Sequence, residues 1–242
     1  MPKEFVLVHG ASHGAWCWDE VAVVLRRAGH RVITLDLPGH GRRAAEAGRA
    51  SMEAYGRAVA DVMAREGASR SILVGHSMGG PVIQKAAEMA TGRIAHLVFL
   101  AAVVLPSGGS LEGVHFTRVG RALMHGLAAA RGDGTFAYPA ETAWARWMGD
   151  LPRSHPTVAR ALASLTPQPL RPFVERVDYS VFERLLMPRT YLRCLGDLAV
   201  VPARAAAYAA RLGVSPLDMK TAHDPMLSAP EALARLLEKI PA

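Results

Sequence analysis

A serine between two glycines is the feature of this sequence whose spacing most directly predicts chemistry. Ser77 lies in the stretch GHSMGG, directly after an apolar run and directly before a segment with helical periodicity. A sharp strand-to-helix turn holds such a serine in a strained backbone conformation, and the flanking glycines remove side chains that would block the turn. The turn exposes the hydroxyl and points the first N–H groups of the helix toward the atom it attacks. We therefore predict that Ser77 is a nucleophile.

A serine hydroxyl reacts poorly at neutral pH, so it needs a general base and a third group that orients the base. In the enzyme fold of which this serine turn is typical, the acid and then the histidine follow the serine along the chain. His223 is the only histidine after His155 and lies in the polar loop KTAHDPML. We predict that His223 is the general base and that His76, beside the serine, packs elsewhere.

Four aspartates compete for the role of the orienting acid. Asp197 fits best, because it lies in the loop after the next-to-last predicted strand. Asp178 lies within a long insertion and Asp218 inside the final predicted strand. Asp224 directly follows the predicted base, and although a loop neighbour rarely has the geometry to orient its predecessor, it stays an open alternative.

An oxyanion formed at an acyl carbon needs two N–H donors. Met78, the residue after the nucleophile, offers one backbone N–H. Ala11, in the loop HGASHGAWCW after the first apolar run, is predicted to offer the other. In the same loop, Gly10 lets the backbone approach a substrate closely, and Ser12 is predicted to contact the substrate.

Short apolar runs bounded by turn residues must position these side chains. They occur at 5–8, 31–36, 71–75, 96–101, 190–195 and 216–220, and helical patterns separate most of them. Such alternation predicts an α/β fold, with a mostly parallel sheet of about six strands and helices on both faces. The helical patterns include 77–91 and a last helix in which Ser228 and Glu231 have the spacing of a capping box. We expect residues 1–242 to form a single domain.

One region, residues 105–188, interrupts the alternation, and we predict no strand in it. It is rich in glycine and proline and contains large apolar side chains. A long insertion between sheet strands is typical of a lid, so Tyr138, Trp144 and Trp147 are predicted to contact the substrate. The alternative is a helical decoration with a small core of its own.

Composition narrows the class of protein. The formal net charge is +7, with 28 basic and 21 acidic residues, but the basic residues are scattered and no nucleic-acid motif is present, so we expect no nucleic-acid partner. Cys17 and Cys194 have no CxxC or Cys/His ligand spacing, so we predict neither a disulfide framework nor a metal site. The sequence contains no run of about 18 apolar residues, so we predict no membrane span. The first residues lack the pattern of a signal peptide, and a cytoplasmic protein is the expectation.

The sequence resembles the α/β-hydrolase superfamily in the serine turn GHSMGG and in the stretches FVLVHGASHGAWCW, LDLPGHG, CLGDLAVVP and AHDPMLSAPEAL. FVLVHGASHGAWCW resembles the branch that contains plant methylesterases, hydroxynitrile lyases and bacterial esterase relatives. The resemblance implies a Ser77–His223–Asp197 triad with Ala11 and Met78 as oxyanion donors, and no metal or organic cofactor. Hydroxynitrile lyases of this kind have a threonine where this sequence has Gly10, and a lysine where it has Asp224. Both differences disfavour the carbon–carbon bond cleavage that those lyases catalyse.

These features predict a serine hydrolase that cleaves a carboxylic ester of a small, apolar or aromatic substrate through an acyl-enzyme. A serine nucleophile also disfavours dehalogenase and epoxide hydrolase chemistry, which needs a carboxylate. A thioesterase or a lactonase would use the same residues, and a ligand-binding protein on the same fold is an alternative of a different class. A homodimer through the insertion stays open, as does the identity of the substrate.

Overall fold

A six-stranded parallel sheet forms the centre of the molecule. The computed structural model describes residues 1–241, and its main sheet has the order β2-β1-β3-β4-β7-β8. The strands are β1 (Glu4–Val8), β2 (Arg31–Thr34), β3 (Ser71–His76), β4 (Ile94–Leu100), β7 (Arg189–Cys194) and β8 (Leu217–Met219). The predicted α/β fold with about six strands is confirmed.

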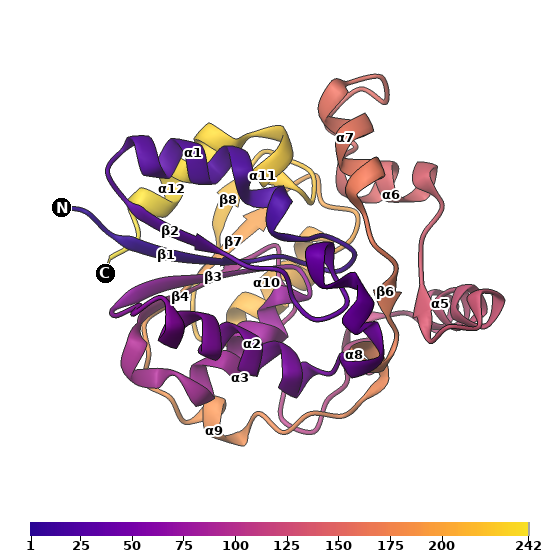
Figure 1. Cartoon of the computed structure of the whole chain (residues 1–242), viewed down its shortest axis with the longest axis horizontal. Coiled ribbons are helices and arrows are strands. Elements are labelled where there is room, and N and C mark those ends of the chain that lie inside the picture. Colours follow the sequence, from indigo (N-terminus) through magenta and orange to yellow (C-terminus); the bar gives the residue numbers. More distant parts are fainter. Residues whose placement is uncertain (242) are drawn as a thin grey trace.

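Helices cover both faces of this sheet (Figure 1). On one face lie α1 (Asp19–Arg27), α11 (Pro225–Ser228) and α12 (Pro230–Glu238). On the other lie α2 (Met52–Arg65), α3 (Gly79–Met89) and α10 (Pro202–Arg211). Short 3-10 segments occur at Ala15–Trp18, Gly41–Arg49 and Thr91–Arg93. None of the helices in residues 1–241 is both long enough and apolar enough to cross a membrane.

The strands are apolar on both faces because each face has its own core. In β3, Ile72 and Val74 join the cluster under α1 and α12, whereas Leu73 joins the cluster under α2 and α3. β4 continues the alternation, with Val98 on the first side and Phe99 on the second. Burial on both faces is typical of parallel sheets and explains the near-continuous apolar runs in the sequence.

The turn from β3 to α3 is strained at Ser77, which has a left-handed φ of 54°. The glycines around Ser77 are needed because a side chain at these positions would collide with nearby backbone atoms. A Cβ on Gly75 would lie 2.4 Å from the carbonyl oxygen of Gly79, and one on Gly80 would lie 2.1 Å from that of Val103. Gly80 lies outside the GxSxG pattern, yet it packs at least as tightly as the glycines within it.

Gly80→Ala is therefore expected to destabilise the protein. Overpacking of this kind costs about 1–3 kcal/mol, because the backbone carbonyl of Val103 would have to move. The matched control is Gly126→Ala on the exposed side of another helix, where an added Cβ meets nothing within 4 Å. Alanine at such a helix position gains about 0.5–1 kcal/mol. Urea denaturation should give opposite signs for the two variants, and equal stabilities would contradict the packing argument.

Residues 105–188 lie between β4 and β7, and much of this segment extends from the body of the molecule (Figure 1). Its helices are α4 (Leu111–His115), α5 (Arg118–Arg131), α6 (Ala140–Trp147), α7 (Pro156–Ser164), α8 (Arg171–Val174) and α9 (Ser180–Glu183). The prediction that the segment contains no strand is wrong, because β5 (Thr135–Phe136) pairs antiparallel with β6 (Gln168–Pro169). Two-residue strands are too short to produce an alternating pattern.

The side chains of this insertion pack into the two main clusters. Trp147 and Val158 belong to the cluster under α1 and α12, and Phe136 and Phe173 belong to the cluster under α2 and α3. The packing does not resemble a decoration with a separate core. The interpretation of residues 105–188 as a lid stays a prediction.

The predicted capping box of the last helix is wrong. α12 begins at Pro230, and Ala229 is its N-cap, while Ser228 ends the preceding helix α11. The Ser228 hydroxyl faces the carbonyl of Asp224 at 3.5 Å rather than capping α12. Proline is well suited to the first turn because its fixed φ matches the helix and the missing N–H would have no partner there.

Candidate active site

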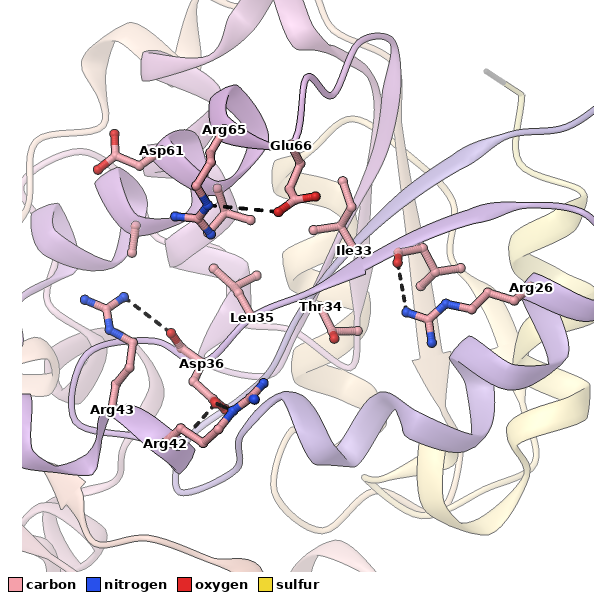
Figure 2. A pocket seen from close by; sticks show the side chains of 13 residues that line it. Arg26, Ile33, Thr34, Leu35, Asp36, Arg42, Arg43, Asp61, Arg65 and Glu66 are labelled. Atoms are coloured by element: carbon pink, nitrogen blue, oxygen red, sulfur yellow. Dashed lines mark hydrogen bonds and ion pairs between the residues drawn. The ribbon is translucent and has the colours of Figure 1, made fainter.

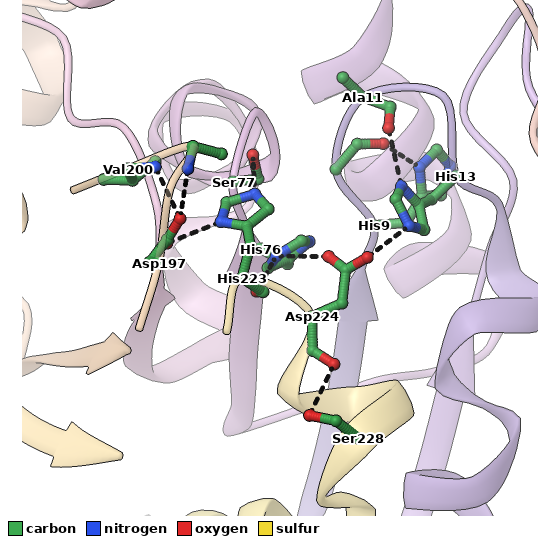
Figure 3. Close-up of polar contacts among 12 residues, drawn as sticks. His9, Ala11, His13, His76, Ser77, Asp197, Val200, His223, Asp224 and Ser228 are labelled. Carbon is green, nitrogen blue, oxygen red and sulfur yellow. Dashed lines mark hydrogen bonds and ion pairs between the residues drawn. The ribbon is translucent and has the colours of Figure 1, made fainter. Parts of the chain in front are cut away.

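Ser77, His223 and Asp197 form one chain of hydrogen bonds (Figure 3). The Ser77 hydroxyl lies 2.9 Å from Nε2 of His223, and Nδ1 of the same ring lies 2.7 Å from Oδ2 of Asp197. Ser77 follows β3, Asp197 follows β7 and His223 follows β8. Because neighbouring parallel strands end at the same edge of a sheet, residues 146 positions apart in the chain meet there.

The carboxylate of Asp197 is held in one orientation. Its Oδ1 accepts the backbone N–H groups of Ala199 at 2.7 Å and Val200 at 2.8 Å, which leaves Oδ2 for the imidazole. A carboxylate only accepts, so Nδ1 of His223 must donate and Nε2 is free to take a proton from Ser77. Burial opposes the imidazolium, but the attraction and hydrogen bond of Asp197 outweigh it and raise the pKa of His223.

The two predicted oxyanion donors flank the nucleophile. Ala11 and Met78 both line the cavity that contains Ser77, and Met78 is the N-cap of α3. Gly10 is required by close packing, since a Cβ there would lie 2.9 Å from both Nδ1 of His76 and Cβ of Ser77. A residue larger than glycine would therefore push against the nucleophile turn.

A second buried histidine–aspartate pair lies behind the first. Nε2 of His13 lies 3.1 Å from Oδ2 of Asp224, and Nδ1 of His13 lies 2.8 Å from the carbonyl oxygen of Ala11. Both ring nitrogens of His13 therefore lie within hydrogen-bond distance of an acceptor oxygen. Burial alone would raise the pKa of Asp224, but His13, His76 and His223 together lower it. The pair links the predicted oxyanion loop to the residue after the predicted base.

Asp224 is thus engaged with other residues and does not orient His223. Nε2 of His76 lies 3.0 Å from the carbonyl oxygen of His223 and 3.5 Å from Oδ1 of Asp224. Both partners accept, so this nitrogen carries the proton of a neutral ring. Burial and the neighbouring His223 lower the pKa of His76 well below its usual value, consistent with a neutral ring. The contacts of the His76 ring are thus with His223 and Asp224.

Replacing Asp224 with Asn tests this pair. A hydrogen bond to a buried charged group is worth about 1.5–3 kcal/mol, so we expect Asp224→Asn, which retains the shape but removes the charge, to cost about 2 kcal/mol. The double variant His13→Gln/Asp224→Asn removes both partners and should cost less than the sum of the two single variants. The free energy of unfolding in urea measures all three, and strictly additive losses would show that the pair is not coupled.

The cavity at Ser77 is small and mostly apolar. It has a volume of about 40 Å³, and it is lined by Ala11, Ser77, Met78, Val103, Leu111, His115, Phe116, Phe136, Tyr138, Arg146, Trp147, Phe173 and Ala199. Tyr138 and Trp147 are among these residues, and their contact with a substrate stays a prediction. A cavity needs about 10–15 Å³ of such space to hold one water molecule, so this one has room for a few.

Three residues that we predicted to bind substrate do not line this cavity. Trp144 donates its indole N–H to the carbonyl of Leu151 at 3.0 Å, within the insertion. Ser12 donates its backbone N–H to the side chain of Gln168 at 3.1 Å, and its carbonyl accepts the N–H of Thr166 at 2.8 Å. Ser12 therefore attaches the oxyanion loop to the insertion. Gly10 serves the packing described above.

Of two other cavities, one adjoins the cavity at Ser77 and the other does not. An outer cavity of about 290 Å³ shares residues with the inner one, including Tyr138 and Arg146. A polar surface cavity of about 590 Å³ lies beside the edge strand β2 (Figure 2), and its charged groups bind one another, as in Arg42 with Asp36 at 3.5 Å. Ser77, His223 and Asp197 are not among the residues that line the cavity in Figure 2.

His76, His223 and Asp224 also form a compact group of potential metal ligands, whose atoms lie within 4.8 Å of one another. Most of these atoms have hydrogen-bond partners, although Nδ1 of His76 and Oδ1 of Asp224 are buried without one within residues 1–241. His223 uses both ring nitrogens on Ser77 and Asp197, and His76 and Asp224 contact the groups described above. The arrangement fits a hydrogen-bond network better than a metal site.

The parallel sheet and the serine at the turn after its third strand define an α/β-hydrolase. The chain belongs to the alpha/beta hydrolase family, whose profile matches residues 5–236. Its resemblance to the branch that includes plant methylesterases is also confirmed by the relatives found.

Individual relatives are similar over part or all of the chain. Esterase PIR7B of Oryza sativa subsp. japonica is 42% identical over 46% of this chain and 42% of its own length. The carbendazim hydrolyzing esterase of a Nocardioides species is 45% identical over 44% of this chain and 45% of its own length. These alignments span less than half of either relative. A solved extracellular alpha/beta-hydrolase from a Paenibacillus species, titled as homologous in structure and function to tobacco salicylic acid binding protein 2, is 28% identical. It has a TM-score of 0.90 and covers 98% of both chains.

Proposed function

We propose that this protein hydrolyses carboxylic esters with Ser77 as nucleophile, His223 as general base and Asp197 as orienting acid. The observation that carries the proposal is the continuous hydrogen-bond chain of these three side chains beside a cavity. The esterase names of the relatives support the same reaction class.

In the proposed mechanism, Nε2 of His223 takes the proton of Ser77 as its Oγ attacks the ester carbonyl. The backbone N–H groups of Ala11 and Met78 hold the negative oxygen of the tetrahedral intermediate. The intermediate collapses, and the alcohol leaves with the proton from His223. Water then gives a proton to the same nitrogen and attacks the acyl-enzyme. Collapse of this second intermediate releases the acid and returns the proton from His223 to the oxygen of Ser77.

The substrate class is proposed from the residues of the cavity. Aromatic and aliphatic side chains, including Phe116, Phe136, Phe173 and Trp147, surround Ser77. Such walls favour an apolar or aromatic group next to the scissile bond. The volume of about 40 Å³ implies that side chains of the insertion move before an ester binds.

Hydroxynitrile-lyase chemistry is disfavoured by the charge next to the base. Where that reaction would need a cation to hold departing cyanide, this chain has the carboxylate of Asp224, paired with His13. A thioesterase or a lactonase would use the same three side chains. A binding protein of the same fold would have no need for the close contact between Ser77 and His223.

The test is hydrolysis of p-nitrophenyl esters of graded acyl length, with matched thioesters and lactones assayed in parallel. We expect turnover of oxygen esters with higher kcat/KM for apolar acyl groups. Higher kcat/KM for thioesters or lactones would reassign the substrate class. No turnover, together with a small ligand that raises Tm, would replace the proposed enzyme by the binding protein.

Location and assembly stay proposals. The cytoplasmic location rests on the sequence alone, and the solved Paenibacillus relative is titled as extracellular. A small-molecule ester is the proposed partner, and a homodimer formed through residues 105–188 remains the open alternative to a monomer.

A further inference from the structure

The cavities that lead to Ser77 are lined by two arginines and, among the described residues, by no Asp or Glu. Arg146 lines both the inner and the outer cavity, and Arg204 lines the outer one. The two cavities share five lining residues, which are His115, Phe116, Tyr138, Arg146 and Ala199. The two cavities are therefore adjacent, and the outer one, here called the entrance, is the side from which we expect a substrate to reach Ser77.

Neither arginine is neutralised by the protein. Arg153, elsewhere in the insertion, pairs with Glu141 at 2.8 Å. By contrast, within residues 1–241 neither Arg146 nor Arg204 has an Asp or Glu oxygen within the 4.0 Å of an ion pair. The Nε of Arg146 is buried without a hydrogen-bond partner in the same residues, and its guanidinium carbon lies 5.9 Å from the ring centre of Tyr138. A buried donor left unpaired is costly, so an acceptor from a ligand would relieve it.

The electrostatics of the entrance agree with this geometry. Burial, followed by the positive charges of Arg204, His223 and Arg146, lowers the pKa of His115 to about 3. His115 is therefore neutral at neutral pH, and its Nδ1 lies 3.1 Å from the hydroxyl of Tyr208. The charge of the entrance comes from the two guanidinium groups.

We propose that the entrance binds a carboxylate of the substrate, so that the preferred esters carry a free carboxylate remote from the scissile bond. This inference rests on the proposed ester hydrolysis. The planar guanidinium of Arg146 suits a carboxylate, because it can donate two parallel hydrogen bonds. The apolar middle of such a half-ester would lie among the aromatic side chains of the inner cavity, with its ester carbonyl at Ser77. The net charge of +7 adds long-range attraction for an anionic substrate.

Two matched pairs of esters test the proposal: mono-p-nitrophenyl adipate against p-nitrophenyl hexanoate, and mono-p-nitrophenyl suberate against p-nitrophenyl octanoate. In the wild type, we expect the anionic ester of at least one pair to have the higher kcat/KM. In Arg146→Gln/Arg204→Gln the ratio of anionic to neutral kcat/KM should fall about tenfold or more, because the charge-assisted hydrogen bonds to the carboxylate are lost. Arg153→Gln removes the same charge from an exposed position and should retain the ratio.

A wild-type preference for the neutral ester in both pairs would overturn the proposal. So would an equal loss for both members of a pair in the double variant. Calorimetric titration of Ser77→Ala with monomethyl adipate separates binding from catalysis. If no ester is hydrolysed but this variant binds monomethyl adipate, and the added Arg146→Gln/Arg204→Gln changes abolish binding, the carboxylate site stands and the proposed hydrolysis fails. Absence of binding in that case would overturn both.

Discussion

Ser77→Ala is expected to lower kcat for p-nitrophenyl ester hydrolysis by about 10³-fold or more. The change removes the only atom that would form the acyl bond and leaves its neighbours in place. The backbone at Ser77 has a left-handed φ of 54°, and alanine, which also carries a Cβ, should be held there by the same surrounding contacts. Burst kinetics with the wild type should show one acyl group per molecule, and the variant should show no burst.

The comparison is informative only if the variant is folded. Its Tm and near-UV circular dichroism should therefore match those of the wild type. Ser107→Ala is a suitable control of equal size, because that hydroxyl bonds Asp178 at 2.6 Å in the insertion and does not line the cavity. A folded Ser77→Ala protein that retains more than about a tenth of the wild-type rate would exclude Ser77 as the nucleophile.

Asp197→Asn is expected to lower kcat by roughly 10⁴-fold, because it selects the wrong form of the imidazole. The Asn carbonyl would keep the N–H groups of Ala199 and Val200, which Oδ1 of Asp197 now accepts. Its NH₂ would then face Nδ1 of His223 and turn that nitrogen into an acceptor. The proton would move to Nε2, which could no longer take one from Ser77.

The pH profile separates this effect from simple misfolding. His223 acts as a base only when neutral, so kcat/KM should rise with pH around its raised pKa, above the usual value of 6.5. Without the charge of Asp197, burial is left as the main influence and lowers that pKa. The residual activity of Asp197→Asn should therefore rise at a lower pH than that of the wild type. A midpoint that stays in place, or moves to higher pH, would contradict the assigned role of Asp197.

The fold and the three central side chains could be predicted because local patterns carry them. The strand runs are apolar on both faces, and GHSMGG marks the strand-to-helix turn. His223 and Asp197 follow from chain order, and the structure brings both to Ser77. Whether they act as proposed is a matter for the experiments above.

Contacts between distant segments could not be predicted in this way. The pair of His13 and Asp224 joins residues 211 positions apart, and no local pattern links them. In the insertion, Trp144 and Trp147 have the same residue type and are one helical turn apart, yet only Trp147 lines the cavity. Periodicity places both on one side of a helix, but the packing of the insertion decides which reaches Ser77. The sequence also does not single out Arg146 and Arg204 as ligand-binding residues, because residue type alone does not distinguish an unpaired arginine from a paired one.

The small cavity at Ser77 affects how any measured affinity is read. If residues 105–188 act as the lid that we predict, only molecules in which this insertion has opened would bind an ester, because the cavity beside Ser77 measures about 40 Å³. The apparent dissociation constant then equals the intrinsic constant divided by the fraction of open molecules. An ester that fits the open form well would still appear to bind weakly. A substitution that favours opening would raise kcat/KM for every substrate alike, without changing any group that takes part in the reaction.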